Sequence, residues 1–415
     1  MDELKTIPGK VNLELFDIST FTPQKIREIF RGGKLPTAEA MVDEIVLRAL
    51  KAGATEVHIE PRESELSVRL FCDGLFRRLV SLPREISDNI ITALKIKTSL
   101  NQSEKRAPQE GGYTVSIGGV SADVRMSTLP TLSGERVSLR IVRKREGLPK
   151  IDELGLSGEN SEKLFRLIHR SSGLVLSAGP AGGGEDTIVR ACLAELQGPE
   201  KNIMTMEEKI DHKMDFASQV RTSPAPGSTP PEIFRLVMRH NPDILMLTEV
   251  RDMETGMIAA DAVQSDVLVF STVLARDAIG TIVRLRNFGL SPYWVATILA
   301  GVIHQKLIRK ICGECMESST PTPEELSSLG TSPSDAFYKG RGCDACDGTG
   351  YRENTGIHEI LTVDDRLRDL ILRDAPFLQL KEAAQASGFE DIRTDAVKKA
   401  RAGLTTLQEI LRVLG

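Results

Sequence analysis

The segment GLVLSAGPAGGGEDT, Gly173–Thr187, limits the fold of this chain more than any other stretch. Its first half is apolar or small, which predicts a buried strand, and its second half is rich in glycine. The residues that follow, TIVRACLAEL, place apolar side chains at helical spacing. A strand that enters a glycine-rich turn and then a helix is the layout in which backbone N–H groups surround a phosphate. The sequence therefore predicts an α/β fold with a loop of this kind.

The side chains of this loop have the opposite charge to that expected for binding phosphate. Loops of the form G-x-x-x-x-G-K-[ST] place a lysine and a hydroxyl where this chain has Glu185 and Asp186. A like charge at ~4 Å costs about 4 kcal/mol at an effective dielectric of ~20, so we expect ATP and Mg²⁺ binding to be possible but weakened. Alternatively, the two carboxylates hold Mg²⁺ directly. The candidate nucleotide-binding residues are Gly179, Pro180, Ala181, Gly182, Gly183, Gly184, Glu185, Asp186 and Thr187.

Strands and helices alternate in the second part of the chain. DILMLTEV and DVLVFSTV read as buried strands, and PPEIFRLVMRH reads as a helix. Thr229 and Glu232 fit a capping box at its start, with Pro230 in the first helical position. Such alternation predicts a mostly parallel sheet with helices on both faces. We assign residues 157–415 to this domain, with a helical C-terminus from about residue 360.

The first part of the chain has a different pattern. In TAEAMVDEIVLRALKAG the apolar residues fall on one helical face, with Thr37 as the N-cap. Alternating segments on either side of Asp73 and Gly74 predict a hairpin. We expect an N-terminal extension at residues 1–35, a small α+β domain at 36–146 and a linker at 147–156.

The cysteines predict a metal site. Four of the six cysteines form two Cys-x-x-Cys pairs, which suits a tetrahedral zinc ion in a reducing compartment. An ion held by four thiolates is closed to water, so the role would be structural. The alternative is that the four are small buried residues without a metal. The candidate ligands, in a zinc-binding segment at 312–346, are Cys312, Cys315, Cys343 and Cys346.

Composition and charge exclude several classes of protein. The chain of 415 residues is 40% hydrophobic and 27% charged, which is typical of a globular protein, and its net charge of -5 predicts no nucleic-acid partner. The longest apolar stretch, Tyr293–Ile303, is too short to cross a bilayer, so we expect no transmembrane segment. The N-terminus lacks the apolar core of a signal peptide. We therefore expect a cytoplasmic location.

Several segments resemble signatures of the secretion ATPase family, the hexameric P-loop motors of type II secretion and type IV pilus assembly. In chain order they are HIEP at 58–61, RAPQEGG at 106–112, STLPTLSGERVSLRI at 127–141, HNPDILMLTEVRDMET at 240–255 and GCDACDGTGYRENTGIHEI at 342–360. The resemblance covers roughly residues 36–415. The long N-terminal regulatory module of many members has no counterpart in it.

The resemblance implies a fold and a setting. The fold would be a small N-terminal domain joined to a RecA-like P-loop NTPase domain, with neighbouring subunits of a homo- or hetero-hexamer closing each nucleotide site. The ring would lie at the cytoplasmic face of the inner membrane, as a peripheral partner of secretion or pilus platform proteins. In this family, paired cysteines are typical of assembly and secretion motors.

The resemblance also implies catalytic positions. Glu207 and Glu249 match acidic positions of the family, and Arg125 and Arg140 remain in segments that match the family's arginine positions. Glu249 ends a strand, where it would orient water for attack on the γ-phosphate. The alternative roles are acceptance of a hydrogen bond from Arg251 by the Glu249 carboxylate, and structural ion pairs for the two arginines.

Other positions depart from the family pattern. Val267 and Leu274 stand where histidines are usual, and Phe71 and Gly112 stand where arginines are usual. Together with the loop, these changes favour a degenerate subunit whose ATP hydrolysis is weak or absent. Two alternatives remain open: an active ATPase with atypical phosphate and magnesium binding, and a binding module that works outside any secretion machine.

Overall fold

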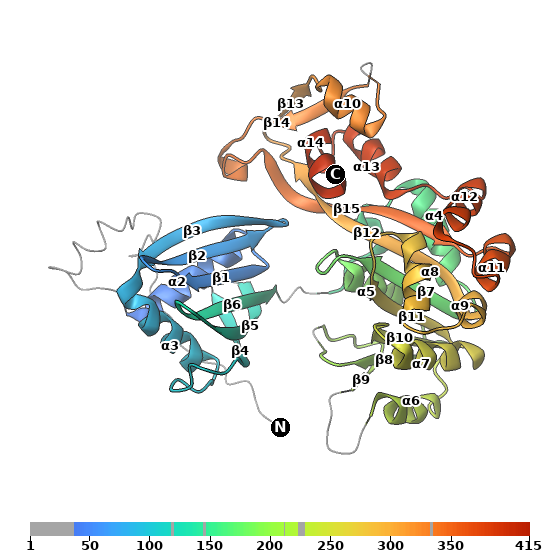
Figure 1. Ribbon diagram of the computed structural model, residues 1–415, viewed down its shortest axis with the longest axis horizontal. Coiled ribbons are helices and arrows are strands. Elements are labelled where there is room, and N and C mark those ends of the chain that lie inside the picture. The colour runs from blue at the N-terminus through green and yellow to red at the C-terminus, as the bar shows by residue number, and fades with distance from the viewer. Residues whose placement is uncertain (1–36, 118–119, 144–146, 211, 223–228, 333–334) are drawn as a thin grey trace. The chain divides into compact units, whose positions relative to one another are not determined.

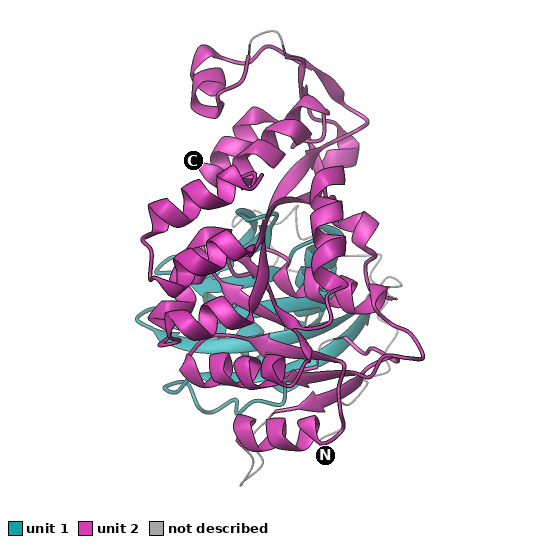
Figure 2. Ribbon diagram, turned by 90° about the vertical axis from the view of Figure 1, so that its right-hand side faces the viewer, with its two compact units in different colours: residues 1–146 teal, residues 147–415 magenta. Residues whose placement is uncertain are grey.

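The computed structural model describes residues 37–117, 120–143, 147–210, 212–222, 229–332 and 335–415. The expected extension at 1–35 lies outside these residues. The chain divides into two compact units, Met1–Glu146 and Gly147–Gly415, which Figure 2 colours teal and magenta. Each unit has its own hydrophobic core.

Unit 1 is an antiparallel sheet with helices packed against it (Figure 1). The strands, in spatial order, are β3 (Leu75–Pro83), β2 (Glu65–Cys72), β1 (Glu56–Pro61), β6 (Gly134–Arg143), β5 (Val120–Thr131) and β4 (Gln109–Ile117). The helices are α2 (Ala38–Lys51), the short η2 (Arg84–Ile86) and α3 (Ser87–Lys97). Apolar side chains of α2 and α3 join alternate strand residues in one core.

Local signals in unit 1 act as expected. The Thr37 side chain accepts a hydrogen bond from the N–H of Ala40, which confirms it as the N-cap of α2. Asp73 and Gly74 both have positive φ, 53° and 77°, and join β2 to β3. Asp–Gly is the pair that such a tight hairpin turn favours, so the predicted hairpin is confirmed.

Unit 2 is built on a seven-stranded sheet. In spatial order its strands are β15 (Tyr351–Thr362), β12 (Leu299–Ile311), β7 (Gly173–Gly179), β11 (Leu268–Leu274), β10 (Ile244–Glu249), β8 (Ile203–Glu207) and β9 (Ser218–Arg221). Every neighbouring pair is parallel except β12 and β15. The predicted α/β class with a mostly parallel sheet is confirmed.

Helices cover both faces of this sheet. Alternate residues of the buried strand β7 therefore point into two different hydrophobic cores. Leu174 and Leu176 join the core shared with α6, α7, α8, α9, α11 and α12, whereas Val175 joins the core shared with α4 and α5. The helices are η3 (Ile151–Leu154), α4 (Gly158–Ile168), α5 (Glu185–Glu195), α6 (Pro230–Met238), α7 (Met253–Gln264), α8 (Ala278–Asn287), α9 (Pro292–Ile298), α11 (Asp365–Leu372), α12 (Phe377–Ala386), α13 (Ile392–Arg401) and α14 (Leu407–Leu414).

Residues 147–156 include η3, and Leu154 is buried in the core beside α5. The apolar stretch Tyr293–Ile303 changes from helix to strand at Leu299, where α9 meets β12.

The capping box of Thr229 and Glu232 at α6 is confirmed. In the described part of the chain, no helix is long and apolar enough to span a membrane.

A small subdomain lies between the two cysteine pairs. It consists of β13 (Met316–Ser319), α10 (Pro323–Leu329) and β14 (Phe337–Gly340), and the short η4 (Asp344–Cys346) follows inside the second pair. Strands β13 and β14 pair with each other and form their own two-stranded sheet.

Candidate functional site

The glycine-rich loop joins the central strand β7 to the start of α5. Gly182 and Gly184 have φ values of 79° and 92°, which side chains rarely tolerate, and the Gly183 N–H bonds to the Pro180 carbonyl at 2.8 Å. Gly184 is the N-cap of α5, and the helix begins at Glu185. The residues therefore form a strand–loop–helix with the N–H groups of a helix start at its mouth.

The carboxyl end of the sheet brings most of the predicted positions together. Leu274, the last residue of β11, pairs with Gly179 of β7, and Glu249 of β10 pairs with Thr272 of β11. Glu207 ends β8, the next strand beyond β10. An apolar side chain thus stands beside the start of the loop, at the position where the family resemblance implies a histidine.

Glu185 is buried inside the loop and does not point into solvent. Its relative exposure is 8%, and its Oε1 has no hydrogen-bond partner among the described residues. Burial raises the pKa of the Glu185 carboxyl, and the charges of Asp186 and Glu249 raise it further, although the nearby N–H groups of Glu185 and Gly184 lower it in part.

Asp186 and Glu207 are joined by one arginine. The Nε of Arg190 lies 2.6 Å from Asp186 Oδ2, and its terminal nitrogen lies 2.8 Å from Glu207 Oε2. Glu207 is 1% exposed, and its other oxygen accepts from Thr205 at 2.7 Å and from Gln219 at 2.9 Å. The carboxylates of Glu207 and Asp186 therefore both already accept hydrogen bonds from other residues of the protein.

Glu249 lies apart from this cluster of hydrogen bonds. Arg251, its expected partner, forms its ion pair with Glu208 and a longer contact of 3.9 Å with Asp252. Glu249 forms no ion pair within the described residues, and its charge contributes to the raised pKa of Glu185. Among the described acidic residues at this edge, Glu207 and Glu208 are ion-paired and Glu249 is not.

The predicted positions of unit 1 fall in a single row across its sheet. Cross-strand pairing aligns Phe71 with Glu56, Glu56 with Arg140, Arg140 with Arg125 and Arg125 with Gly112. Directly paired residues point to the same face, so the four family positions share one surface. Arg140 is exposed and forms no ion pair with a described residue. Arg125 is half-buried and has an interaction partner.

The four paired cysteines meet at one point. Their sulfur atoms all lie within 4.8 Å of one another, and the contacts Cys312–Cys343, Cys315–Cys346 and Cys343–Cys346 measure 3.8, 3.9 and 3.7 Å. A tetrahedral ion with bonds of about 2.3 Å separates its sulfurs by about 3.8 Å. The cluster therefore has the geometry to hold a metal ion.

Backbone groups support this cluster. The N–H groups of Cys343 and Gly350 donate to the Cys346 sulfur at 3.2 Å each. Burial raises the pKa of the Cys346 thiol, but these two donors outweigh it and lower the pKa to about 6. Gly340 and Gly350 pass so close that a Cβ on either would overlap the other's backbone. No other group of metal ligands of this size occurs among the described residues.

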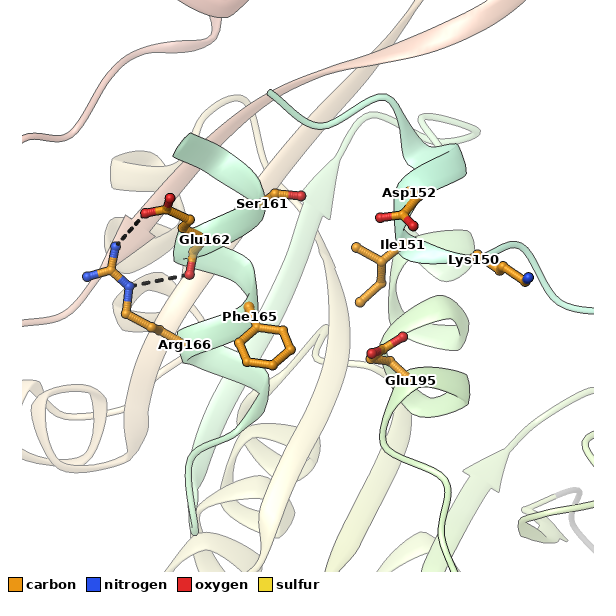
Figure 3. Close-up of a pocket in the computed structure, with 8 residues that line it drawn as sticks. All are labelled: Lys150, Ile151, Asp152, Ser161, Glu162, Phe165, Arg166 and Glu195. Atoms are coloured by element: carbon orange, nitrogen blue, oxygen red, sulfur yellow. Dashed lines mark hydrogen bonds and ion pairs between the residues drawn. The ribbon is translucent and has the colours of Figure 1, made fainter. Parts of the chain in front are cut away.

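A cavity of about 520 Å³ lies at the other end of α5 from the loop (Figure 3). It lies between η3 and α4, and Arg166 and Glu162 form an ion pair at its rim. Its lining residues are Lys150, Ile151, Asp152, Ser161, Glu162, Phe165, Arg166 and Glu195. None of the predicted site residues belongs to it.

Sequence reasoning missed the polar residues buried beneath the loop. The Gln305 amide donates to the Gly183 carbonyl at 2.6 Å, and its Oε1 lies 2.6 Å from His358 Nε2. On the same strand pair, Glu359 accepts from the N–H groups of Ala278 and Ile392, which begin α8 and α13. The only sequence signal was a pair of polar residues inside each of two apolar strands, HQ in LAGVIHQKLI and HE in TGIHEIL.

Comparison with known proteins places this geometry in a family. The family model described as type II/IV secretion system protein matches residues 33–412. The type II secretion system ATPase E of Vibrio cholerae is 36% identical over 375 residues, which cover 90% of this chain and 74% of the relative. The type IV pilus assembly ATPase PilB of Thermus thermophilus is 35% identical over 378 residues, and the chain spans only 42% of its length.

Solved structures agree on the fold. The ATPase DotB of Legionella pneumophila has a TM-score of 0.65 at 17% identity and matches 92% of this chain and 97% of its own. The pilus retraction motor PilT with bound ADP has a TM-score of 0.58 at 20% identity, with 91% of this chain and 97% of its own matched. The matched length, the sequence identity and the fold lead to one conclusion: the chain belongs to the type II/IV secretion system protein family.

Proposed function

We propose that this chain is a degenerate subunit of the type II secretion and type IV pilus assembly ATPases, with weak or absent ATP hydrolysis. The observation that carries the proposal is the buried Glu185 carboxyl at the place where a phosphate-binding loop has lysine. A carboxyl there supplies no positive charge to the β- and γ-phosphates, and Asp186 supplies no hydroxyl for Mg²⁺. Stabilisation of the charge that develops in the transition state is thereby lost.

Other residues of the same edge support this proposal. Leu274 beside Gly179 offers no hydrogen-bond donor, and the oxygens of Glu207 already accept from Arg190, Thr205 and Gln219. The loop glycines Gly182 and Gly184, in contrast, keep the positive φ angles that shape a tight loop before a helix. The chain would therefore retain the shape of a nucleotide site while lacking most of its side-chain chemistry.

A second function, an active ATPase with atypical phosphate and magnesium binding, is favoured by Glu249. This carboxylate ends β10 and has no ion-pair partner among the described residues, so it could orient water. ATP and Mg²⁺, when bound, would supply the leaving group and the charge that the loop lacks. The route in which Glu185 and Asp186 hold Mg²⁺ has less support, because Asp186 faces Arg190.

The cysteine cluster supports a structural zinc ion as the resident metal. The sulfur separations of 3.7 to 3.9 Å fit four thiolate ligands, and a closed set of four leaves no open position for catalysis. Cys312, Cys315, Cys343 and Cys346 would bind it and fix the subdomain of β13, α10 and β14 on unit 2.

Assembly and location complete the proposal. We infer a homo- or hetero-hexamer at the cytoplasmic face of the inner membrane, in which the chain is peripheral and contacts secretion or pilus platform proteins. The support is the family to which the chain belongs and the names of its relatives, a type II secretion ATPase and a pilus assembly ATPase. The domain limits 36–146 and 157–415, with linker 147–156, are part of the same proposal.

The deciding experiment is an ATP turnover assay on purified, zinc-replete protein. We expect no more than trace phosphate release, and no further loss in Glu249→Gln. Turnover that Glu249→Gln abolishes would reject the degenerate subunit and favour the active ATPase. Co-purification with no inner-membrane platform protein would favour a binding module outside the secretion machines.

A further inference from the structure

The loop interior is filled by the chain itself. The Glu185 side chain turns back toward the end of β7, where a Cβ on Gly179 would lie 3.1 Å from its Cγ and 3.2 Å from its Oε1. On the other side, the same Cβ would lie 2.7 Å from the Gln305 carbonyl. Gly179 therefore leaves room for the Glu185 side chain in a space bounded by β12.

The backbone donors of the loop face this side chain. The Glu185 carboxyl lies beside the N–H groups of Gly184 and Glu185, which lower its pKa, and its buried Oε1 has no hydrogen-bond partner among the described residues. These N–H groups belong to the first turn of the helix, where they have no partner within the helix and normally bind a capping group or an anion. Here the side chain of the first helical residue lies in the space where such a group would approach.

The loop backbone is also held in this shape from below. Gln305 donates to the Gly183 carbonyl at 2.6 Å, and a Cβ on Gly184 would overlap the Gln305 amide nitrogen. The Gln305 side chain is itself 3% exposed and is held by His358. The carboxyl is thus enclosed by a fixed backbone and is not free to swing away with a flexible loop.

We propose that the Glu185 side chain is the resident occupant of this loop, so that it blocks the approach of a phosphate group to the N–H groups at the start of α5. The inference rests on the proposed function, because it gives the physical reason for which the loop holds nucleotide weakly. It goes beyond charge reversal. A phosphate would have to displace a buried side chain, and would not merely meet a repulsive charge.

Occupancy and charge make different predictions for two substitutions. Glu185→Gln removes the negative charge but keeps a side chain of the same size with an oxygen acceptor. Glu185→Ala removes both the charge and the occupant. If the occupant is the barrier, only Glu185→Ala frees the donors; if the charge is the barrier, both variants gain phosphate affinity alike.

The test uses the full chain, Mg²⁺ and inorganic pyrophosphate, with binding measured by calorimetry at pH 7.5. We expect Glu185→Ala to bind pyrophosphate at least about tenfold more tightly than both wild type and Glu185→Gln. Glu195→Ala and Glu195→Gln are the matched controls, because Glu195 is an exposed carboxylate at the opposite end of the same helix. Equal gains in the two Glu185 variants, or no gain in either, would overturn the proposal.

A second measurement covers the case in which Glu185→Ala does not fold. In wild-type protein, the amide resonance of Gly184 should shift with pH as the carboxyl that it contacts titrates, and the shift should vanish in Glu185→Gln. If the Gly184 amide resonance of wild-type protein does not shift with pH, the proposal that Glu185 occupies the loop is wrong. The proposed weak hydrolysis is judged separately, by ATP turnover in wild type, so either idea can fail while the other stands.

Discussion

Gln305 on β12 and His358 on β15 lie opposite each other in the strand register, and their Oε1 and Nε2 atoms are 2.6 Å apart. Because the Gln305 amide also donates to the Gly183 carbonyl, this pair links the glycine-rich loop to the C-terminal layer of unit 2. The link continues through Asp395 of α13, which accepts from the His358 backbone at 2.9 Å and from Lys399 at 2.6 Å.

Removal of Gln305 should destabilise unit 2. Gln305→Ala leaves the Gly183 carbonyl and the His358 ring without their buried partner, and an unsatisfied buried group costs about 1–3 kcal/mol. We therefore expect a loss of about 2–4 kcal/mol in the free energy of unfolding, measured by thermal or urea denaturation. Gln385→Ala on the exposed face of α12 is the control and should change little. A Gln305→Ala protein as stable as this control would contradict the link.

Stability should depend on pH through Glu359. Burial, together with the neighbouring charges of Asp277 and Asp391, raises its pKa to about 7, although the N–H groups of Ala278 and Ile392 lower it in part. In the unfolded chain the Glu359 carboxyl has a pKa of about 4.3. The folded state therefore keeps the proton on Glu359 up to a higher pH than the unfolded state does. The stability that this difference contributes is lost as the pH rises from about 4.5 to about 7.

Glu359→Gln cannot ionise, so it serves as the reference for this effect. Relative to the variant, wild type should lose up to about 3 kcal/mol of stability between pH 4.5 and pH 7.5. His304, 3.5 Å away, has its pKa lowered to about 4 by burial and stays neutral over most of this range in both folded proteins. Melting temperatures that run parallel in wild type and variant across this range would show that Glu359 does not titrate as stated.

The cysteine cluster should hold about one zinc ion per chain. Cys343→Ser replaces one thiolate ligand and should release the metal and lower the melting temperature, because metal binding and folding are coupled. Elemental analysis of protein prepared without chelator is the measurement. Cys192→Ala, which removes a buried cysteine outside the cluster, should keep the full metal content. Metal-free wild type, or a Cys343→Ser protein with unchanged zinc, would reject the site.

Restoration of the loop chemistry should return binding but not turnover. Replacing Glu185 with Lys and Asp186 with Ser supplies the missing charge and hydroxyl, while Glu207 keeps its ion pair with Arg190. We expect Mg²⁺-dependent ATP affinity to rise at least about tenfold, or about 1.4 kcal/mol, in a calorimetric titration. Hydrolysis should stay slow, because the side chain of Leu274 cannot stabilise charge on the γ-phosphate.

The control for this double variant is Glu195→Lys, which adds positive charge at the far end of α5 and should leave ATP affinity unchanged. Brisk hydrolysis by the double variant would show that the rest of the site is intact. Unchanged affinity would show that the loop is not a phosphate cradle.

The sequence by itself determined the features that depend on short-range chemistry. Thr37 as an N-cap, the Asp73–Gly74 turn and the capping box of Thr229 follow from hydrogen bonds within a few residues, so local patterns suffice to predict them. Alternating strands and helices fixed the parallel sheet, and a parallel sheet brings the ends of its strands to one edge. The cysteine cluster could also be predicted, because the spacing within the two Cys-x-x-Cys pairs is a local pattern.

Only the tertiary structure decided which side chains occupy the site. The loop around the Glu185 carboxyl is held by Gln305, far along the chain, and the partners of Glu207 include Arg190 and Gln219, from a helix and an edge strand. Similarly, β12 and β15 carry polar pairs inside apolar runs, a pattern that gives no local sign of which buried partners they meet. Whether a buried charge is tolerated is settled by the groups that surround it in space, and neighbours in sequence do not specify those groups.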